Sequence, residues 1–404
     1  MRRILLIFLS LSLIAVSLSH GQEGIVAIRA GEILTISGAP VINGVILIED
    51  GKIVAVGKDL DIPDDAPVID ASNSVVMPGL VDANAISIVR GDDNEQSGEI
   101  TPSFRVSSAI SPQDRELKRT VQQGVTTLYV PPGGLNLIGG LGVVMKPVGE
   151  TVAGMIIKGD AALKIVMGSD STRGNRTPRS TRPTNFYYRR PATRMAVAWM
   201  LRKSFFDAQQ YASSREEDDP DMEILSAAMG GRIPIRVTVR RAIDIRTALR
   251  IADEYGLQLI LDECTEGYKV AEEIAEKGMP VVLGPFYYYP GTYSQYYEGR
   301  EPNWDNAGIL AGAGVKVAIA SNVQPQSMDL LTAATFAVRH GMTRAQAFRA
   351  ITLTAAEILG VADRVGSLEK GKDADILILS GDPLEVTSRI QRVIVNGRTV
   401  HVSL

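Results

Sequence analysis

The sequence predicts an α/β protein in which a (β/α)8 TIM barrel carries a small β-sandwich domain built from both chain termini. Through the middle of the chain, continuous apolar runs of strand length alternate with amphipathic helical stretches, the pattern of a parallel sheet covered by helices. Both ends are instead rich in short strands in which apolar residues alternate with small or polar ones. Eight strand–helix units over roughly 290 residues fit one barrel. A doubly wound open sheet is the alternative.

The predicted barrel strands are apolar runs bounded by turn residues, at 80–86, 125–130, 143–146, 163–167, 235–239, 257–262, 280–283 and 315–320. Helical periodicity precedes the second run and recurs between or after the later runs, at 112–123, 242–255, 266–277, 306–313 and 328–340. In such a barrel the residues that follow each strand form the ligand-binding face.

The strand-rich ends flank this barrel on both sides. Glu49-Asp50-Gly51-Lys52 is typical of a hairpin turn in the first of them. We therefore expect one composite β-sandwich domain, made of residues 22–78 plus 367–404, and a barrel made of residues 79–366.

Composition excludes several classes of protein. The chain has 404 residues, of which 45% are hydrophobic and 22% charged, an ordinary globular composition. Its formal charge of −4 gives no basic excess for nucleic acid or anionic lipid. Cys264 is the single cysteine, which excludes an intrachain disulfide and a four-cysteine zinc site.

The first 21 residues resemble an export signal. Arg2 and Arg3 precede a nearly continuous apolar stretch at 4–18, with cleavage expected after Ser19 or Gly21. We expect a periplasmic or secreted protein that has no membrane segment after cleavage; an uncleaved anchor is the alternative. A single thiol is compatible with an oxidising compartment.

Motifs at both ends of the predicted barrel carry a family resemblance. Residues 76–83 read VMPGLVDA, residues 364–375 read RVGSLEKGKDAD, and shorter matches occur at 124–127, 136–140, 351–356, 381–384 and 395–398. Together they resemble the amidohydrolase superfamily, in particular its secreted, imidazolonepropionase-like branch, over nearly the whole mature chain. The first motif resembles the family's PGLIDAH entry to barrel strand one, and the second its return to the terminal sheet.

The resemblance implies a fold and a chemistry. Members hydrolyse non-peptide C–N bonds, such as those of cyclic amides and imides, with one or two divalent metals, usually zinc. The ligands are a His-x-His pair on strand one, histidines on strands five and six and an aspartate on strand eight, and some members add a strand-four lysine or glutamate. The metal lowers the pKa of a bound water, which then attacks the C–N bond.

At the matching positions this sequence lacks most of those donors. The His-x-His pair corresponds to Asn84 and Ile86, and the strand-four lysine to Lys164, with Lys146 as the alternative. The histidines of strands five and six correspond to Thr238 and Glu263, and the aspartate of strand eight to Asn322. Among the histidine and aspartate positions, Glu263 alone keeps a charged donor. Losing one outer-shell group can already cost 10–100-fold in metal affinity, so losing four or five direct ligands should abolish binding. We expect no metal or other cofactor.

The positions of the three histidines also argue against a metal site. His20 lies in the export signal, His340 before a glycine at a predicted helix end, and His401 near the C-terminus. None of the three follows a predicted barrel strand.

Asp262, Glu263 and Glu266 cluster around Cys264 at the end of one predicted strand. They could form an oxygen-ligand site for Mg²⁺ or Ca²⁺, or an acid–base pair. We favour a simpler interpretation, a helix start capped by Thr265, where acidic residues are favourable. Cys264 could be an activated nucleophile, but we favour a buried small residue because it has no histidine partner.

Two inserts follow predicted strands and therefore fall on the ligand face. Residues 169–194 are rich in arginine and residues 286–297 in tyrosine. Guanidinium groups and phenol rings suit an anionic or sugar-like ligand, but they could equally pack on each other or on a second subunit. The ligand-pocket candidates are Arg173, Arg182, Arg240, Asp262, Glu266, Tyr287 and Tyr288. The acidic run at 216–221 is expected to be a solvated loop.

The sequence thus favours a catalytically impaired pseudo-hydrolase that binds a ligand or serves as a scaffold for an active paralogue. The first alternative is an active C–N hydrolase with a non-standard site around Glu263, with Asp262 and Lys164 nearby. The second is a homo-oligomeric interaction module whose tyrosine-rich insert forms the interface.

Overall fold

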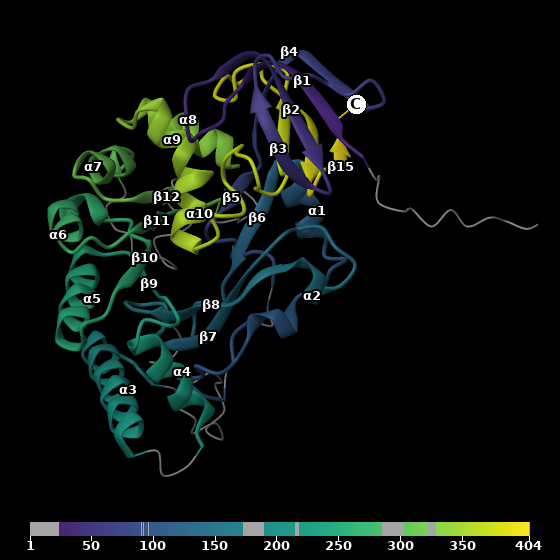
Figure 1. The fold of residues 1–404 in the computed structure, drawn as a ribbon. Coiled ribbons are helices and arrows are strands. Elements are labelled where there is room, and N and C mark those ends of the chain that lie inside the picture. The colour runs from purple at the N-terminus through teal and green to yellow at the C-terminus, as the bar shows by residue number, and fades with distance from the viewer. Residues whose placement is uncertain are drawn as a thin grey trace, which may run out of the picture.

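The computed structural model describes residues 24–89, 91, 93–95, 97–172, 190–214, 218–284, 303–321 and 329–403. They form two sheets with helices packed along one of them, and the strands of the two chain ends lie together at one end of the molecule (Figure 1). The predicted export signal lies outside the described residues. In the described part, no helix is both long and apolar enough to cross a bilayer.

The first sheet is the barrel. Its eight strands follow one another in chain order, β5 (Leu80–Asp82), β6 (Val125–Val130), β7 (Ile138–Met145), β8 (Ile156–Val166), β9 (Ile235–Val239), β10 (Leu259–Glu263), β11 (Val281–Leu283) and β12 (Val317–Ile319). The Ser321 backbone N–H, just past β12, donates to Asp82 Oδ1 on β5 at 3.3 Å and brings the two ends together. Sequential order and near closure confirm the predicted barrel and rule out the doubly wound alternative.

Strand β7 departs from the predicted parallel arrangement. It pairs antiparallel with both β6 and β8, whereas the other neighbouring strands of this sheet pair in parallel. A parallel crossover needs a dozen or more residues, usually with a helix. The β6–β7 loop has no helix, and the β7–β8 connection holds the four-residue α2 (Val152–Met155). The expectation of an all-parallel barrel is therefore wrong at this strand.

Helices pack against the barrel sheet, and five of them begin and end within the predicted ranges. The matching elements are α1 (Arg115–Gln122), α5 (Ala242–Tyr255), α6 (Ala271–Glu276), α7 (Asn306–Gly312) and α8 (Leu330–Arg339). Further described helical elements are η1 (Val106–Ala109), η2 (Gly267–Lys269), α9 (Arg344–Ala350) and α10 (Leu353–Leu359).

Two helices between β8 and β9 were not predicted. They are α3 (Arg194–Ser214) and α4 (Pro220–Met229). The Asp219 side chain accepts hydrogen bonds from the Asp221 and Met222 backbone N–H groups, and Pro220 occupies the first turn. The end of the acidic run is thus a helix start, and its interpretation as a solvated loop is wrong from Asp219 onward.

The second sheet is composite. Its seven strands lie in the order β15-β14-β13-β4-β1-β2-β3 and comprise β1 (Val26–Ile33), β2 (Val41–Glu49), β3 (Lys52–Gly57), β4 (Val68–Pro78), β13 (Ile376–Leu379), β14 (Ile390–Val395) and β15 (Arg398–Val402). Strands β4 and β13 pair antiparallel and so join the two chain ends, as predicted. The backbone N–H of Ile53, on edge strand β3, donates to the carbonyl of Lys372, just before β13. This contact brings the two parts of the sheet together around a shared apolar core.

A buried lysine ties the two sheets together. Lys146, just past β7, lies 2.8 Å from Asp373 Oδ2 and 2.9 Å from Asp375 Oδ1, both next to β13. Its Nζ also donates to Asn396 Oδ1. Lys146 therefore belongs to the junction with the composite sheet, which leaves Lys164 as the fourth-strand lysine of the barrel.

Candidate functional site

Three adjacent strands bring most of the described candidate residues together inside the barrel. In the sheet register, Lys164 on β8 lies beside Arg236 on β9, and Thr238 lies beside Asp262 on β10. Residues two apart on a strand share a face, so these four side chains point to the same side of the sheet. All four residues are buried.

The central contact is an ion pair between Arg236 and Asp262. Arg236 Nη2 donates to Asp262 Oδ1 at 2.6 Å, and its Nε donates to Oδ2 at 3.1 Å. The same guanidinium donates to Ala83 O at 2.8 Å and lies 4.1 Å from the centre of the Tyr129 ring. Two parallel hydrogen bonds and a stacked ring are the geometry that a planar guanidinium suits and a lysine does not.

A second guanidinium holds two further carboxylates near the mouth. Arg240, just past β9, donates through Nε to Glu263 and through Nη1 to Asp170, which follows β8. Burial raises the pKa of the Glu263 carboxyl, while the positive charge of Arg240 opposes that rise. Arg240 was predicted as a ligand contact, and here it is a buried link between two acidic side chains.

The turn after β10 is strained. Glu263 and Cys264 both have positive φ, 71° and 40°, which costs free energy for residues with a side chain. The Cys264 backbone N–H donates to Val239 O at 2.8 Å, which fixes the turn against β9. The Cys264 side chain is fully buried, and burial raises the pKa of its thiol well above the ordinary value. A buried small residue, the favoured interpretation, fits these features.

Glu266 stabilises a different helix from the one expected. Its Oε2 accepts from the backbone N–H of Ala242 at 3.1 Å, at the first turn of α5. The segment after β10 instead forms η2 and then α6, and neither has a side-chain cap. The prediction that Thr265 caps a helix starting at residue 266 is wrong, because the chain first makes this 3-10 turn.

Several buried polar atoms around Arg236 have no hydrogen-bond partner in the described part of the chain. They are Asn84 Oδ1, Thr127 Oγ1, Tyr129 OH, Arg236 Nη1 and Thr238 Oγ1. Buried polar groups are nearly always satisfied by protein, water or ligand. The described residues therefore leave hydrogen-bond donors and acceptors unsatisfied inside the barrel.

These residues do not fit the metal centre that the resemblance implies. Asn84 and Thr238 are neutral, Ile86 offers no donor side chain, and both oxygens of Asp262 are bonded to Arg236. Within the described ranges, no group of three or more His, Cys, Asp or Glu side chains is placed to hold a metal ion. Zinc requires several such donors converging at about 2 Å. The donor set suits guanidinium groups and not a divalent metal.

Five predicted positions cannot be placed in this site. Arg173 and Arg182 of the first insert, Tyr287 and Tyr288 of the second, and Asn322 lie outside the described residues. At the end of the first insert, Arg194 begins α3 and pairs with Asp244 at 2.8 Å.

Arg236, Tyr129 and Asp170 were not among the predicted site residues. One signal for Arg236 was present, namely a charged residue inside the otherwise apolar run 235–239. Such a residue in a buried strand needs a partner, and Asp262 at the end of the next predicted strand supplies it. Nothing in the sequence pattern distinguished Tyr129 or Asp170.

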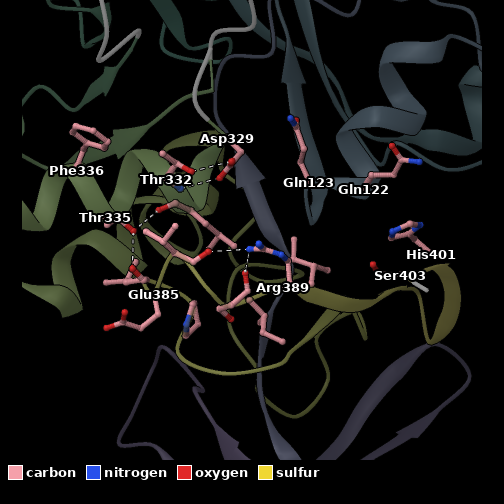
Figure 2. A pocket seen from close by; sticks show the side chains of 17 residues that line it. Gln122, Gln123, Asp329, Thr332, Thr335, Phe336, Glu385, Arg389, His401 and Ser403 are labelled. Atoms are coloured by element: carbon pink, nitrogen blue, oxygen red, sulfur yellow. Dashed lines mark hydrogen bonds between the residues drawn. The ribbon is translucent and has the colours of Figure 1, made fainter. Parts of the chain in front are cut away.

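A hollow lies outside the barrel, between α1, α8 and the C-terminal strands of the composite sheet (Figure 2). Its volume is about 480 Å³. Its charged side chains serve local structure, since Asp329 caps α8 through Thr332, and Arg389 donates to the carbonyls of Val386 and Ser388. The barrel interior, with its concentrated buried charge, is the stronger candidate.

The structure is thus a TIM-type barrel with a composite terminal sheet and ionisable groups at its strand ends. A sequence model of the amidohydrolase family matches residues 243–400. The solved structure of an amidohydrolase from Thermotoga maritima is 30% identical, covers 94% of this chain and 100% of its own, and superposes with a TM-score of 0.85.

Two curated relatives extend the comparison. The imidazolonepropionase of Brucella anthropi is 26% identical over 86% of this chain and 90% of its own length. The amidohydrolase tasK of Hapsidospora irregularis is 24% identical over 88% of this chain, which spans 39% of that relative. The chain belongs to the amidohydrolase superfamily and is imidazolonepropionase-like.

Proposed function

We propose that this protein is a catalytically impaired amidohydrolase that binds a small polar ligand in its barrel without a hydrolytic metal. The main observation in favour of a metal-free barrel is the pair of buried guanidinium groups, Arg236 and Arg240. They bind the acidic side chains at the strand ends. A metal would have to compete with hydrogen-bonded cations for each of these carboxylates.

The balance of basic and acidic side chains inside the barrel favours a ligand with little or no net charge. Three basic side chains, Lys164, Arg236 and Arg240, lie beside three acidic ones, Asp170, Asp262 and Glu263. The unpartnered polar atoms beside them can donate or accept hydrogen bonds. Such a site suits a molecule with carbonyl, amide or hydroxyl groups.

The test compares binding with turnover. Hydantoin, a cyclic imide, is added to the purified protein with and without zinc, and both thermal unfolding and hydrolysis are followed. We expect a rise in Tm with no hydrolysis in either condition. Hydrolysis that depends on added zinc would overturn the proposal.

One observation favours an alternative, an active hydrolase that uses Glu263. Burial raises the pKa of this carboxyl, which is a property of many general acids. If hydrolysis occurs without zinc, the Glu263→Gln variant decides. Loss of turnover with retained binding would establish this alternative, whereas unchanged turnover would exclude it.

The proposed setting is outside the cytoplasm. It rests on the resemblance of residues 1–21 to an export signal. N-terminal sequencing of the protein from the periplasm or medium tests this proposal, with a mature end expected near Gln22.

A further inference from the structure

Another hollow, of about 1090 Å³, lies outside the barrel, where the composite sheet meets the connection between β7 and β8. Val148, Gly149 and Gly154 line it from that connection. The connection ends where β8 begins, at the opposite end of the barrel from the residues that follow β8, β9 and β10. The hollow is therefore separate from the candidate site inside the barrel, and its volume is large enough for a small ligand.

Two tight turns line one side of this hollow. Asp50-Gly51 joins β2 to β3 and Asn396-Gly397 joins β14 to β15, with φ values of 48°, 76°, 49° and 73°. These are the left-handed values of a two-residue hairpin turn. Ala374 links the turns, because its N–H donates to the Gly51 carbonyl at 2.8 Å and its carbonyl accepts from the Gly397 N–H at 2.9 Å. The backbone on this side of the hollow is thus held in place before any ligand binds.

The lining has an excess of positive charge. It contains four basic side chains and two acidic ones, namely Lys52, Arg364, Arg392, Arg398, Asp50 and Asp373. Asp373 is already bonded to basic groups, since it accepts from Lys52, from Arg364 at 2.9 Å and from Lys146 at 2.8 Å. The chain as a whole carries a formal charge of −4, so this local excess is opposite in sign to the rest of the protein. A hollow of this charge attracts anions.

Two of the basic side chains are available to a ligand. Within the described ranges, the guanidinium groups of Arg392 and Arg398 form no hydrogen bond or ion pair with another residue. A guanidinium can bind a carboxylate through two parallel hydrogen bonds. Apolar side chains line the same hollow, among them Val26, Ile48, Ile69 and Val148. The lining therefore suits an anion that also has an apolar part.

We propose that this hollow binds a small amphipathic carboxylate, of the class of a medium-chain fatty acid. The carboxylate is bound by Arg392 and Arg398, and the hydrocarbon chain lies against the apolar lining. The inference goes beyond the proposed function and does not depend on it, because neither arginine belongs to the barrel interior.

The experiment measures binding of octanoate to the full chain by isothermal titration calorimetry, well below the concentration at which octanoate forms micelles. We expect one octanoate per chain. Octanol, which has the same chain without the charge, should bind at least about tenfold more weakly, because the charge-assisted hydrogen bonds are lost. Acetate, which keeps the carboxylate without the chain, should also bind at least about tenfold more weakly, because little apolar surface is buried.

A double variant tests the assigned residues. Arg392→Gln with Arg398→Gln should weaken octanoate binding at least about tenfold. The matched control is Arg232→Gln with Arg250→Gln, which removes the same charge from exposed positions outside the hollow and should bind like the parent. Val148→Asp tests the opposite wall: this residue is 38% exposed, so the change is tolerated, and the added negative charge should also weaken binding. Thermal unfolding of each variant establishes that it is folded.

Equal affinity of the Arg392/Arg398 double variant and its control for octanoate would overturn the inference. Octanol or acetate binding as tightly as octanoate, or no octanoate binding to the parent, would overturn it as well. Hydantoin, the probe of the proposed barrel site, should raise the Tm of the double variant as much as that of the parent. The two sites can therefore fail or succeed independently.

Discussion

Arg236 and Asp262 lie on adjacent barrel strands and form a two-point ion pair, with hydrogen bonds of 2.6 and 3.1 Å. Both residues are essentially excluded from solvent, at 1% and 0% exposure. A buried pair of this kind adds little net stability, but losing one member leaves the other charge unsolvated.

We expect Arg236→Met to destabilise the protein by about 3–5 kcal/mol, because Asp262 is left buried without its partner. The double variant Arg236→Met, Asp262→Leu should recover most of that loss, since no charge remains unpaired. Urea unfolding of the three proteins measures both effects. A double variant less stable than Arg236→Met would contradict this explanation.

The two buried lysines should respond differently to the same change. Lys146→Met leaves Asp373 and Asp375 without their common partner, and we expect a loss of about 3–5 kcal/mol. Lys164→Met removes an amine that forms no close ion pair, and we expect stability within about 1 kcal/mol of the parent. Equal losses in denaturant unfolding would show that Lys164 is held as firmly as Lys146.

Glu263 should make stability depend on pH. Its pKa is raised in the folded state, so the folded protein holds this proton more tightly than the unfolded chain. Its stabilising contribution is complete below the ordinary value of 4.5 and is lost as pH rises through the folded pKa. Relative to Glu263→Gln, the parent should become progressively less stable from about pH 4.5 upward. Parallel stability–pH curves for the two proteins would refute this.

Gly79 joins the composite sheet to the barrel where β4 meets β5. A Cβ atom at this position would lie 2.1 Å from Thr126 Oγ1 and 2.4 Å from its Cγ2. We expect Gly79→Ala to cost about 1–3 kcal/mol through overpacking, with partial rescue by Thr126→Gly. Gly134→Ala is the control, because among the described residues, its chain neighbours aside, no atom lies within 4 Å of the added carbon. Thermal unfolding is sufficient to rank these variants.

Much of the fold could be predicted from local pattern. Each of the eight barrel strands overlaps a run identified by apolar continuity, although β7 and β8 begin at Ile138 and Ile156, well before the predicted starts at 143 and 163. Helix α5 matches its predicted range of 242–255. Strand direction was not predictable in the same way. Nothing in the composition of 138–145 shows that this run returns antiparallel, because direction depends on how the chain connects to it.

The candidate site was predictable in part. The replacement of histidine at Asn84 and Thr238 could be read directly from the motifs. The partner of Arg236 is 26 positions away at Asp262, and Glu266 caps a helix that begins at Ala242. Such long-range contacts follow from the assembled barrel, so periodicity and propensity cannot reveal them.

The metal content of the purified protein tests the central claim most directly. The protein is incubated with excess zinc, dialysed, and analysed by inductively coupled plasma mass spectrometry beside a zinc-binding amidohydrolase. Guanidinium groups bonded to the acidic side chains predict that zinc is removed by dialysis. One or two zinc ions retained per chain, and lost only on unfolding, would contradict the account.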